Sequence, residues 1–302
     1  MARLGNVAVD YLIRPMRVDD VPSVERLTAE AFYDLDVRTH RAGWPEPAHR
    51  TQQRSARWQH ELLHILEHDG NGCWIAENDS GAIGAAASTR RDLTWILATF
   101  VVRRGYQGRG VGRQLLDASS SHGNGCLRAM LVASEDPLAV RRYRLAGFTM
   151  HPTMLLRGKV ARFHLPVVER VREGSRGDID LLNSVDRQIR GSAHGVDHEL
   201  LTTMYRLVVV DRSTGSGYAY VEATGGAHVL VATNRRTASD LLWEALAASS
   251  PEEPCTVGRL TPAQEWAIDV GLSARMELHS RGYLALRDMK PPMPYIPSGH
   301  FL

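Results

Sequence analysis

Along this chain, apolar and polar residues are spaced first as in a strand and then as in a helix, and this order occurs twice. The segment Ile13–Phe32 begins as a short strand, passes through acidic residues typical of a helix start, and continues with apolar residues at Val21, Val24, Leu27 and Ala31, the spacing of one helix face. The segment Val168–Val185 repeats this layout. The pattern predicts a strand followed by a helix in each half of the chain.

Two further pairs of segments repeat in the same order. Cys73–Ala87 and Leu207–Tyr220 each predict a β-hairpin, a strand, a polar turn with glycine and a second strand. A later helix carries Leu115-Leu116 in the first half and Leu241-Leu242 in the second, and the turn Leu145–Phe148 pairs with Asp269–Leu272. Chance would not preserve both the order and the local pattern. We infer two copies of one α/β unit, with a boundary near 158–166.

Two segments stand outside the repeat. The interval between Phe32 and Trp74 has no counterpart in the second half; it contains His40, Trp44, Trp58 and His64, and Ala56–Glu67 predicts a helix. Such an insertion either shapes a substrate pocket or is a surface addition with a local core. The tail Met289–Leu302 is rich in proline and is predicted to be extended.

Composition excludes several classes of protein. The 302 residues are 43% hydrophobic and 23% charged, with a formal net charge of +2, which is ordinary for a globular protein and predicts no nucleic acid partner. Cys73, Cys126 and Cys255 are too far apart for a metal site, so we expect reduced, buried thiols and no metal. The sequence shows neither a signal peptide nor a membrane-spanning run, which predicts a cytoplasmic protein with no membrane partner.

The chemistry is concentrated in a glycine-rich stretch. Thr94–Val102 predicts a strand, Arg103–Gly112 a glycine loop and Arg113–Ser119 a helix. Because Gly108, Gly110 and Gly112 lack a side chain, the backbone can curl and present N–H groups at the positive end of the helix dipole. This arrangement favours a phosphate or pyrophosphate ligand.

Two common classes of phosphate-binding loop do not match this stretch. A P-loop requires Lys and then Ser or Thr after the last glycine, but Arg113-Gln114 follows here, and a dinucleotide fingerprint requires glycine where Leu115 stands. Val102–Gly112 instead resembles the acyl-coenzyme A signature of the GNAT superfamily of N-acyltransferases. Its fixed positions fall on Gln107, Gly110 and Gly112, although Arg104 stands where many members have Pro.

A second motif extends the resemblance. Asp136–Phe148 matches the family pattern Asn-Pro-x-Ala-x-x-x-Tyr-x-x-x-Gly-Phe except that Asp136 replaces Asn, which keeps a helix N-cap acceptor. The resemblance covers Ile13–Lys159 and implies bound acetyl-CoA. The residues implied to bind it are Phe100, Val101, Val102, Gln107, Gly108, Arg109, Gly110, Val111, Gly112, Arg113, Asp136 and Ala139.

The resemblance also implies a mechanism in which an amine attacks the thioester directly. Tyr143 would then protonate the departing thiolate, with a buried core aromatic as the other interpretation of this residue. Carbonyl polarisation would come from a backbone N–H near Val101 or Val102. The strand before the loop contains no carboxylate, so the general base stays open among Glu30, Asp34, Asp36, His40, a water chain and the Leu302 carboxylate.

The second copy lacks these features. The strand Val229–Thr233 leads into Asn234–Asp240 without a glycine, and no tyrosine matches Tyr143. This half resembles a degenerate GNAT domain that either completes the acceptor pocket or builds a homodimer, an arrangement similar to that of mycothiol synthase. The predicted domains are 1–160, 166–288 and a tail at 289–302.

The fold class implied is α/β (α+β), two tandem GNAT-like units, each with a mixed, mostly antiparallel sheet flanked by helices. The predicted function is transfer of an acetyl group from acetyl-CoA to an amine-bearing small molecule or peptide. The alternative is a non-catalytic acyl-CoA sensor.

Overall fold

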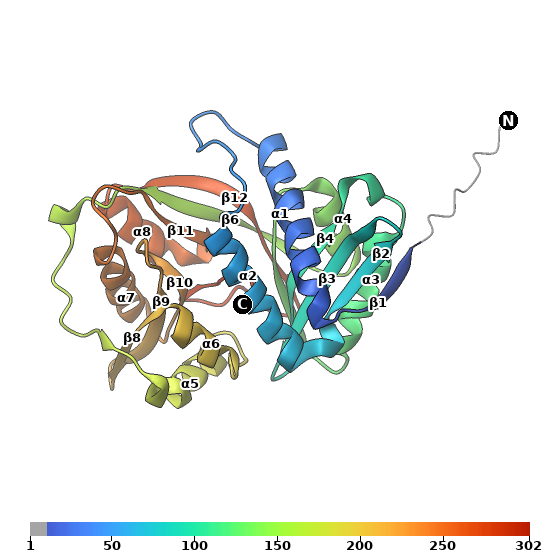
Figure 1. Ribbon diagram of the computed structural model, residues 1–302. Helices are drawn as coiled ribbons and strands as arrows, with labels where there is room; N and C mark the ends of the chain where they lie inside the picture. The colour runs from blue at the N-terminus through green and yellow to red at the C-terminus, as the bar shows by residue number, and fades with distance from the viewer. Residues whose placement is uncertain (1–10) are drawn as a thin grey trace. The chain divides into compact units, whose positions relative to one another are not determined.

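The computed structural model describes residues 11–302, and its packing divides the chain into two units (Figure 1). Unit 1 contains the residues up to Thr89 and Leu97–Asn124, and unit 2 contains Arg90–Ile96 and Gly125–Leu302. Both units combine helices with mainly antiparallel strands, so the predicted mixed α/β fold is confirmed. The predicted limits 1–160, 166–288 and 289–302 stay predictions.

Unit 1 has four strands in the order β1-β2-β3-β4. The elements are β1 (Leu12–Pro15), α1 (Val21–Arg38), α2 (Gln52–Asp69), β2 (Trp74–Asn78), β3 (Gly81–Arg91), β4 (Thr94–Val102) and α3 (Val111–Ser120), with the tip of the β3–β4 turn assigned to unit 2. The hairpin β2–β3, the helix predicted at Ala56–Glu67 and the strand predicted at Thr94–Val102 are all present. No helix of the described chain is long and apolar enough to cross a membrane.

The start of α3 is held against the sheet by a small apolar core. Val111 and Leu115 of α3 pack with the buried side chains of Ala76, Ile83 and Ala86. Gly84 of β3 permits this approach, because a Cβ there would lie 2.8 Å from Leu115 Cδ1 and 3.1 Å from the Val101 carbonyl oxygen. The glycine loop before α3 therefore rests on a fixed strand and helix.

Unit 2 contains two sheets, with strand orders β5-β12-β6-β11 and β13-β10-β9-β8-β7. Its strands are β5 (Arg128–Ala133), β6 (Thr149–Gly158), β7 (Arg172–Glu173), β8 (Arg206–Arg212), β9 (Gly215–Val221), β10 (Ala227–Ala232), β11 (Cys255–Leu260), β12 (Glu277–Arg287) and β13 (Tyr295–Ile296). Its helices are α4 (Pro137–Leu145), α5 (Ile179–Ile189), α6 (Asp197–Met204), α7 (Arg235–Ala247) and α8 (Glu265–Ser273). The predicted second hairpin is β8–β9.

Strands β6 and β12 form a long antiparallel ladder with a bulge at its middle. Beyond the bulge, one end of β12 also pairs with β5, and the opposite end of β6 also pairs with β11. Gly282 lies in the bulge at φ +67°, and a Cβ there would lie 2.5 Å from the Ala133 carbonyl oxygen. The ladder is symmetric in topology, since α4 precedes β6 as α8 precedes β12.

An ion pair recurs at the predicted strand-to-helix repeat. In unit 1, Arg14 pairs with Asp20, whose carboxylate also accepts the Arg17 N–H at 2.8 Å. In unit 2, Arg172 pairs with Asp178, whose carboxylate accepts the Ser175 N–H at 2.8 Å. The arginine hydrogen bond lowers the pKa of each aspartate. The same contact at the same spacing supports an internal duplication.

Two details differ from the sequence prediction. The second glycine turn was placed at Asp269–Leu272, but these residues lie inside α8, and the turn follows at Arg275, whose φ is +64°. The turn was misplaced because glycine was expected at the left-handed position, where an arginine stands. Helix α3 begins at Val111 rather than Arg113. The proline-rich tail, predicted to be extended, also packs against unit 2, since β13 pairs with β10 and Leu302 is fully buried.

The three cysteines form no disulfide. Burial raises the pKa of the Cys73 thiol to about 12 and that of Cys255 to about 11. Cys126 is only half-buried, which corrects the expectation that all three are buried. The two buried thiols stay protonated near neutral pH.

Replacing Gly271 in α8 tests the packing of α8 on the ladder. Alanine normally stabilises a helix by about 1 kcal/mol relative to glycine. Here its Cβ would lie 2.7 Å from Leu156 Cδ2 and 2.9 Å from Leu156 Cγ in the core. Because overpacking costs about 1–3 kcal/mol, Gly271→Ala should lower the free energy of unfolding, measured by chemical denaturation. Gly271→Ala with Leu156→Ala should cost less than the sum of the two, and strict additivity would contradict the clash.

Candidate functional site

The loop between β4 and α3 adopts the backbone that its glycines permit. Gly108 and Gly110 have φ values of +74° and +93°, a region that other L-residues rarely adopt. The Gln107 side chain donates from Nε2 to the Val102 carbonyl oxygen at 3.1 Å, which ties the loop back to the end of β4. The loop therefore turns sharply and places Gly110 at the N-cap of α3.

The N-terminus of α3 is open. Its N-cap is Gly110, which has no side chain to cap the Val111 and Gly112 N–H groups, while the Arg113 N–H bonds the Gly110 carbonyl oxygen at 3.0 Å. Gly108, Arg109, Gly110 and Arg113 are exposed. Free N–H groups, the helix dipole and nearby arginines together favour an anion, and a pyrophosphate fits this combination.

Side chains of the strand residues predicted to bind the cosubstrate pack against the start of α3. A Cβ on Gly112 would lie 3.3 Å from Phe100 Cζ and 3.5 Å from Val102 Cγ2, so glycine lets α3 begin directly above these side chains. Val101 and Val111 are buried. Phe100, Val101, Val102 and Val111 therefore position the loop through their side chains, and only their backbone groups are suited to contact a polar ligand.

Asp136 in unit 2 caps the helix that carries Tyr143. Its Oδ1 accepts the Leu138 N–H at 2.8 Å and the Ala139 N–H at 3.3 Å, and the residue is only 9% exposed. The N-cap role expected from the sequence is present. The first N–H groups of α4 are thus occupied by the protein itself, in contrast to those of α3.

Tyr143 lies on α4 and is 5% exposed. Its ring meets the edge of Phe148, with ring centroids 6.4 Å apart. Burial raises the pKa of its hydroxyl, and the Asp136 charge raises it further. The hydroxyl therefore keeps its proton at neutral pH, as a proton donor must.

The candidate bases Glu30, Asp34, Asp36 and His40 are all exposed, on α1 or just after it. The buried carboxylate of α1 is Glu25, which accepts hydrogen bonds from Arg50 Nη1 and Ser55 Oγ, both at 2.8 Å. The sequence analysis passed over Glu25, although it falls four residues after Val21 on the apolar face of the helix. Glu25 ties α1 to the segment that leads into α2.

In the second half, a side chain caps the N-terminus of the corresponding helix, α7. Between β10 and α7 the chain has no glycine, and the Asn234 side chain caps the helix by accepting the Thr237 N–H at 2.9 Å. A side-chain oxygen thus occupies the position that is open at α3. This half lacks the means to hold a pyrophosphate in the same way.

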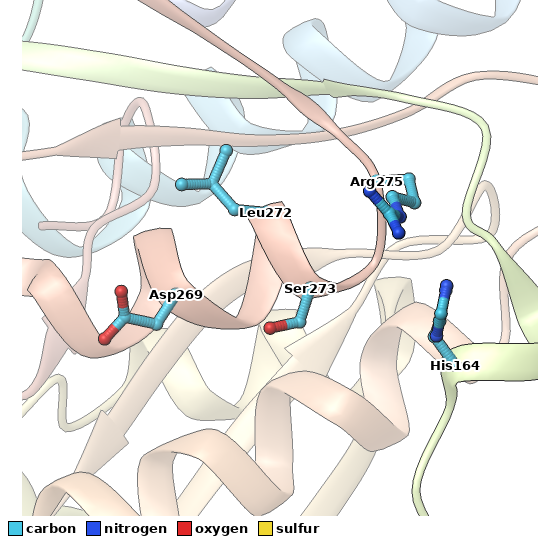
Figure 2. Close-up of a pocket in the computed structure, with 5 residues that line it drawn as sticks. All are labelled: His164, Asp269, Leu272, Ser273 and Arg275. Carbon is cyan, nitrogen blue, oxygen red and sulfur yellow. The ribbon is translucent and has the colours of Figure 1, made fainter.

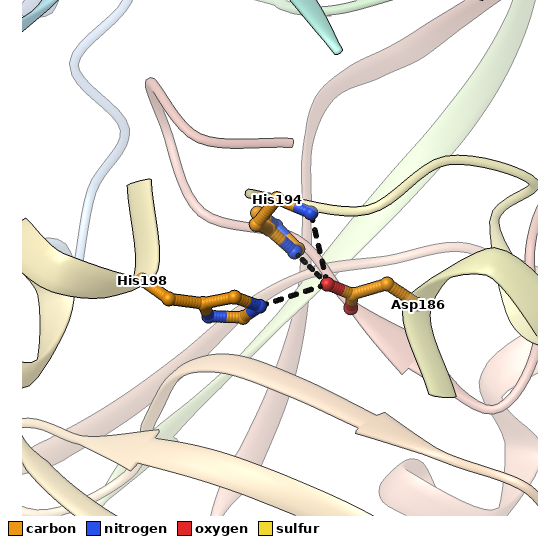
Figure 3. A group of neighbouring side chains, drawn as sticks. All are labelled: Asp186, His194 and His198. Atoms are coloured by element: carbon orange, nitrogen blue, oxygen red, sulfur yellow. Dashed lines mark hydrogen bonds and ion pairs between the residues drawn. The ribbon is translucent and has the colours of Figure 1, made fainter. Parts of the chain in front are cut away.

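A second cluster was missed by the sequence analysis. Asp186 of α5, His194 and His198 of α6 are each no more than 1% exposed, and their ligand atoms lie within 4.8 Å of one another (Figure 3). Asp186 Oδ2 accepts from His194 Nδ1 at 2.8 Å and from His198 Nε2 at 3.0 Å. The two histidines stand four residues apart, a helical spacing, but His194 precedes the helix, so no motif marked the group.

Two tyrosines of β9 complete this cluster. Tyr218 donates its hydroxyl to Asp186 Oδ1 at 2.6 Å, and Tyr220 lies 3.0 Å from His198 Nδ1. Burial lowers the pKa of His194 to about 4, with Arg190 adding to this effect and Asp186 opposing it. Hydrogen bonds and charges from the histidines overcome burial and hold the pKa of Asp186 far below its usual value. The cluster is therefore an ionised carboxylate beside a neutral His194.

A surface hollow in unit 2 lies at the end of α8 and contains none of the predicted site residues. Its lining is His164, Asp269, Leu272, Ser273 and Arg275 (Figure 2). Arg275 is the left-handed residue that ends α8. No other observation connects this hollow with a ligand.

Comparison with known proteins agrees with the geometry of the loop. Residues 29–148 match the model of the acetyltransferase (GNAT) family. No curated protein matches the chain at a significant level. The matched range includes the glycine loop, Asp136, Tyr143 and Phe148.

Solved structures show a similar fold over nearly the whole chain. A proposed acetyltransferase of Pyrococcus horikoshii aligns with a TM-score of 0.74 at 16% identity, covering 100% of this chain and 99% of that one. GCN5-related N-acetyltransferases of Sphaerobacter thermophilus and Kribbella flavida align with TM-scores of 0.58 and 0.56, both at 16% identity. They cover 95% and 91% of this chain, and 98% and 71% of their own. At this identity the likeness establishes the fold.

The His194 environment predicts a specific pH dependence of stability. A histidine has a pKa of about 6.5 when unfolded, and His194 has one of about 4 when folded. Its contribution is therefore full above pH 6.5 and is lost as the pH falls toward 4, by about 3 kcal/mol. Chemical denaturation of His194→Gln between pH 7 and 4 should give a shallower fall in the free energy of unfolding than wild type. Parallel curves would show that His194 is not held neutral by the fold.

Proposed function

We propose that the acetyltransferase domain of the GNAT family formed by residues 29–148 transfers an acetyl group from acetyl-CoA to a primary amine of a small molecule or peptide. The amine nitrogen attacks the thioester carbonyl directly. A C–N bond forms, the C–S bond breaks, the nitrogen loses a proton and the sulfur of coenzyme A gains one. The family match supports acyl transfer in general. The binding of acetyl-CoA and the roles of individual residues rest on the observations that follow.

The open N-terminus of α3 is the observation on which the proposal rests most. The loop Gln107–Gly112 would hold the pyrophosphate of acetyl-CoA through backbone N–H groups, because no side chain caps the helix at Gly110. Exposed Arg109 and Arg113 would add charge-assisted hydrogen bonds to the phosphates. Binding energy from this remote part of the cosubstrate would position the thioester for attack.

Tyr143 is proposed as the group that protonates the departing thiolate. Its raised pKa keeps it protonated but also makes full proton transfer to a thiolate, whose acid has a pKa of about 8.5, unfavourable at equilibrium. The hydroxyl would therefore act first as a hydrogen-bond donor to the negative charge that develops on sulfur. The proton would complete its transfer as the ammonium proton is released.

The second half is proposed to be a degenerate GNAT domain, 166–288, that does not bind coenzyme A. The repeated arginine–aspartate pair before α5 supports a common origin of the two halves. The Asn234 cap supports the loss of cosubstrate binding. Completion of the acceptor pocket and formation of a homodimer are both consistent with such a domain.

Substitution of Tyr143 separates catalysis from binding. Tyr143→Phe keeps the buried ring and removes the hydroxyl, so kcat for thiol release from acetyl-CoA should fall by about a hundredfold or more. Calorimetric affinity for coenzyme A should change less than about twofold. An acceptor panel of amines and peptides supplies the substrate, and undiminished turnover in Tyr143→Phe would remove its proposed role.

Substitution of Gly110 tests the phosphate site. Gly110→Asp places a negative charge at the helix start and strains the left-handed backbone, so the dissociation constant for coenzyme A should rise at least about tenfold. Gly81→Asp is the matched control, because Gly81 also has a positive φ, at a turn of unit 1 with no neighbour within 4 Å. Equal losses in both variants would contradict the assignment. Tight coenzyme A binding without turnover on any acceptor would indicate a sensor instead.

A further inference from the structure

Tyr11, the first residue that the structure describes, places its hydroxyl beside the glycine loop of unit 1. A Cβ built on Gly110 would lie 3.9 Å from the Tyr11 hydroxyl oxygen and 3.9 Å from Gln114 Nε2. Apart from the residues next to Gly110 in the chain, no other described residue comes within 4 Å of that position. Tyr11 and Gln114 are therefore the side chains that border the N-cap of α3.

The Tyr11 ring is held by the same apolar core that supports α3. It packs against the cluster that contains Val111 and Leu115. The next residue, Leu12, begins β1 and pairs with Glu77 of β2. An aromatic ring fixed by packing and followed by a paired strand carries its hydroxyl at a set place. A ligand that accepts a hydrogen bond from it would lose little conformational entropy.

The hydrogen bond between Tyr11 and Gln114 leaves the proton of the hydroxyl available. Gln114 Nε2 donates to the Tyr11 hydroxyl oxygen at 2.7 Å, so this oxygen is the acceptor. A phenol hydroxyl can also donate one hydrogen bond, and Tyr11 donates none within the described chain. Tyr11 is half-buried and Gln114 is exposed, so solvent reaches the pair. The O–H group can therefore turn toward an anion bound at the start of α3.

Tyr11 differs from the arginines of the loop in being held in place. The Arg113 side chain is 72% exposed and lies 3.6 Å from the Asp117 carboxylate, one turn along the helix. The Arg109 guanidinium lies 5.8 Å from the centre of the Tyr106 ring. Both are long side chains that lose rotamer freedom when they bind a phosphate. A fixed neutral donor supplies direction, and the arginines supply charge.

We propose that the Tyr11 hydroxyl donates a hydrogen bond to the pyrophosphate of acetyl-CoA, a role that rests on the function proposed above. Gln114 orients the hydroxyl through its amide. The hydroxyl lies beside Gly110, where the helix dipole and the first N–H groups of α3 favour the pyrophosphate, whereas the ribose separates the 3′-phosphate from that position. Tyr11 is thus a binding residue and takes no part in bond formation or proton transfer.

Tyr106 supplies a matched control. Its hydroxyl also accepts an amide N–H, from Asn78 Nδ2 at 2.9 Å, and its ring packs against the same core. No atom of Tyr106 lies within 4 Å of a Cβ built on Gly108 or Gly110. Tyr106→Phe therefore removes a similar hydrogen bond away from the proposed position of the pyrophosphate.

Calorimetric binding to the full-length protein tests the role of Tyr11. Tyr11→Phe should raise the dissociation constant for coenzyme A at least about fivefold, because a hydrogen bond to a charged group contributes more than one between neutral groups. The constant for dephospho-coenzyme A should rise by the same factor, since this ligand keeps the pyrophosphate. Tyr106→Phe should change both constants less than about twofold. A loss with coenzyme A alone would place Tyr11 on the 3′-phosphate and overturn the assignment.

A double-variant cycle separates a ligand contact from a structural link between Tyr11 and Gln114. Adding Tyr11→Phe to Gln114→Leu should weaken coenzyme A binding further, because the fixed ring still presents its hydroxyl. No further loss would mean that the hydroxyl acts only through Gln114, which would overturn the contact. Wild type that binds no coenzyme A would remove the proposed function as well. Binding lost in Gly110→Asp but unchanged in Tyr11→Phe would remove the role of Tyr11 alone.

Discussion

The antiparallel ladder between β6 and β12 is the constraint on which the arrangement of unit 2 depends. Residues 149–158 and 277–287 are far apart in sequence, yet each strand pairs along its length with the other and has one further neighbour, β11 or β5. A strand with two neighbours has no open edge along the paired residues. The segment β5-α4-β6, which carries Asp136 and Tyr143, is therefore completed by the end of the chain rather than by residues close in sequence.

The position of β12 between β5 and β6 affects any attempt to produce the first half of the chain alone. A fragment that ends near residue 160 would leave β5 and β6 without the strand that lies between them. Unpaired strand edges and exposed apolar side chains favour aggregation. The glycine loop itself rests on β3 and α3, in a core of short-range contacts in unit 1. The glycine loop and Tyr143 thus depend on different parts of the chain for their support.

The two halves also differ in how the corresponding helices α3 and α7 are capped at their N-termini. Both have a strand, a short connection and a helix of at least ten residues, α3 or α7. At α3 the cap is Gly110 and no side chain bonds the first N–H groups, whereas at α7 the Asn234 oxygen satisfies the Thr237 N–H. The helix dipole is common to both, so the cap side chain and the left-handed glycines decide whether a phosphate can approach.

The sequence was sufficient for features encoded locally. Glycine spacing predicted the loop, apolar spacing predicted α1, and the patterns of strand and turn predicted the hairpins. The repeated strand-to-helix layout was also predicted, and the structure adds to it an arginine–aspartate pair in each half, at Asp20 and Asp178. It was insufficient where a feature depends on distant pairing: nothing near Glu277 indicates that its strand lies beside β5. A local preference can also mislead, since Arg275 adopts the left-handed turn that glycine was expected to provide.

The buried cluster around Asp186 in unit 2 also depends on residues far apart in the sequence, so local patterns did not predict it. Asp186 has a structural role, because it holds the His194 backbone N–H and both imidazoles. Arg190 follows Asp186 by four residues at the end of α5 and hydrogen-bonds with the Tyr295 side chain, so a guanidinium and an ionised carboxylate of opposite charge belong to one buried group. Removing either charge alone would leave the other buried and uncompensated, so the guanidinium and the carboxylate are better explained as a pair than one by one.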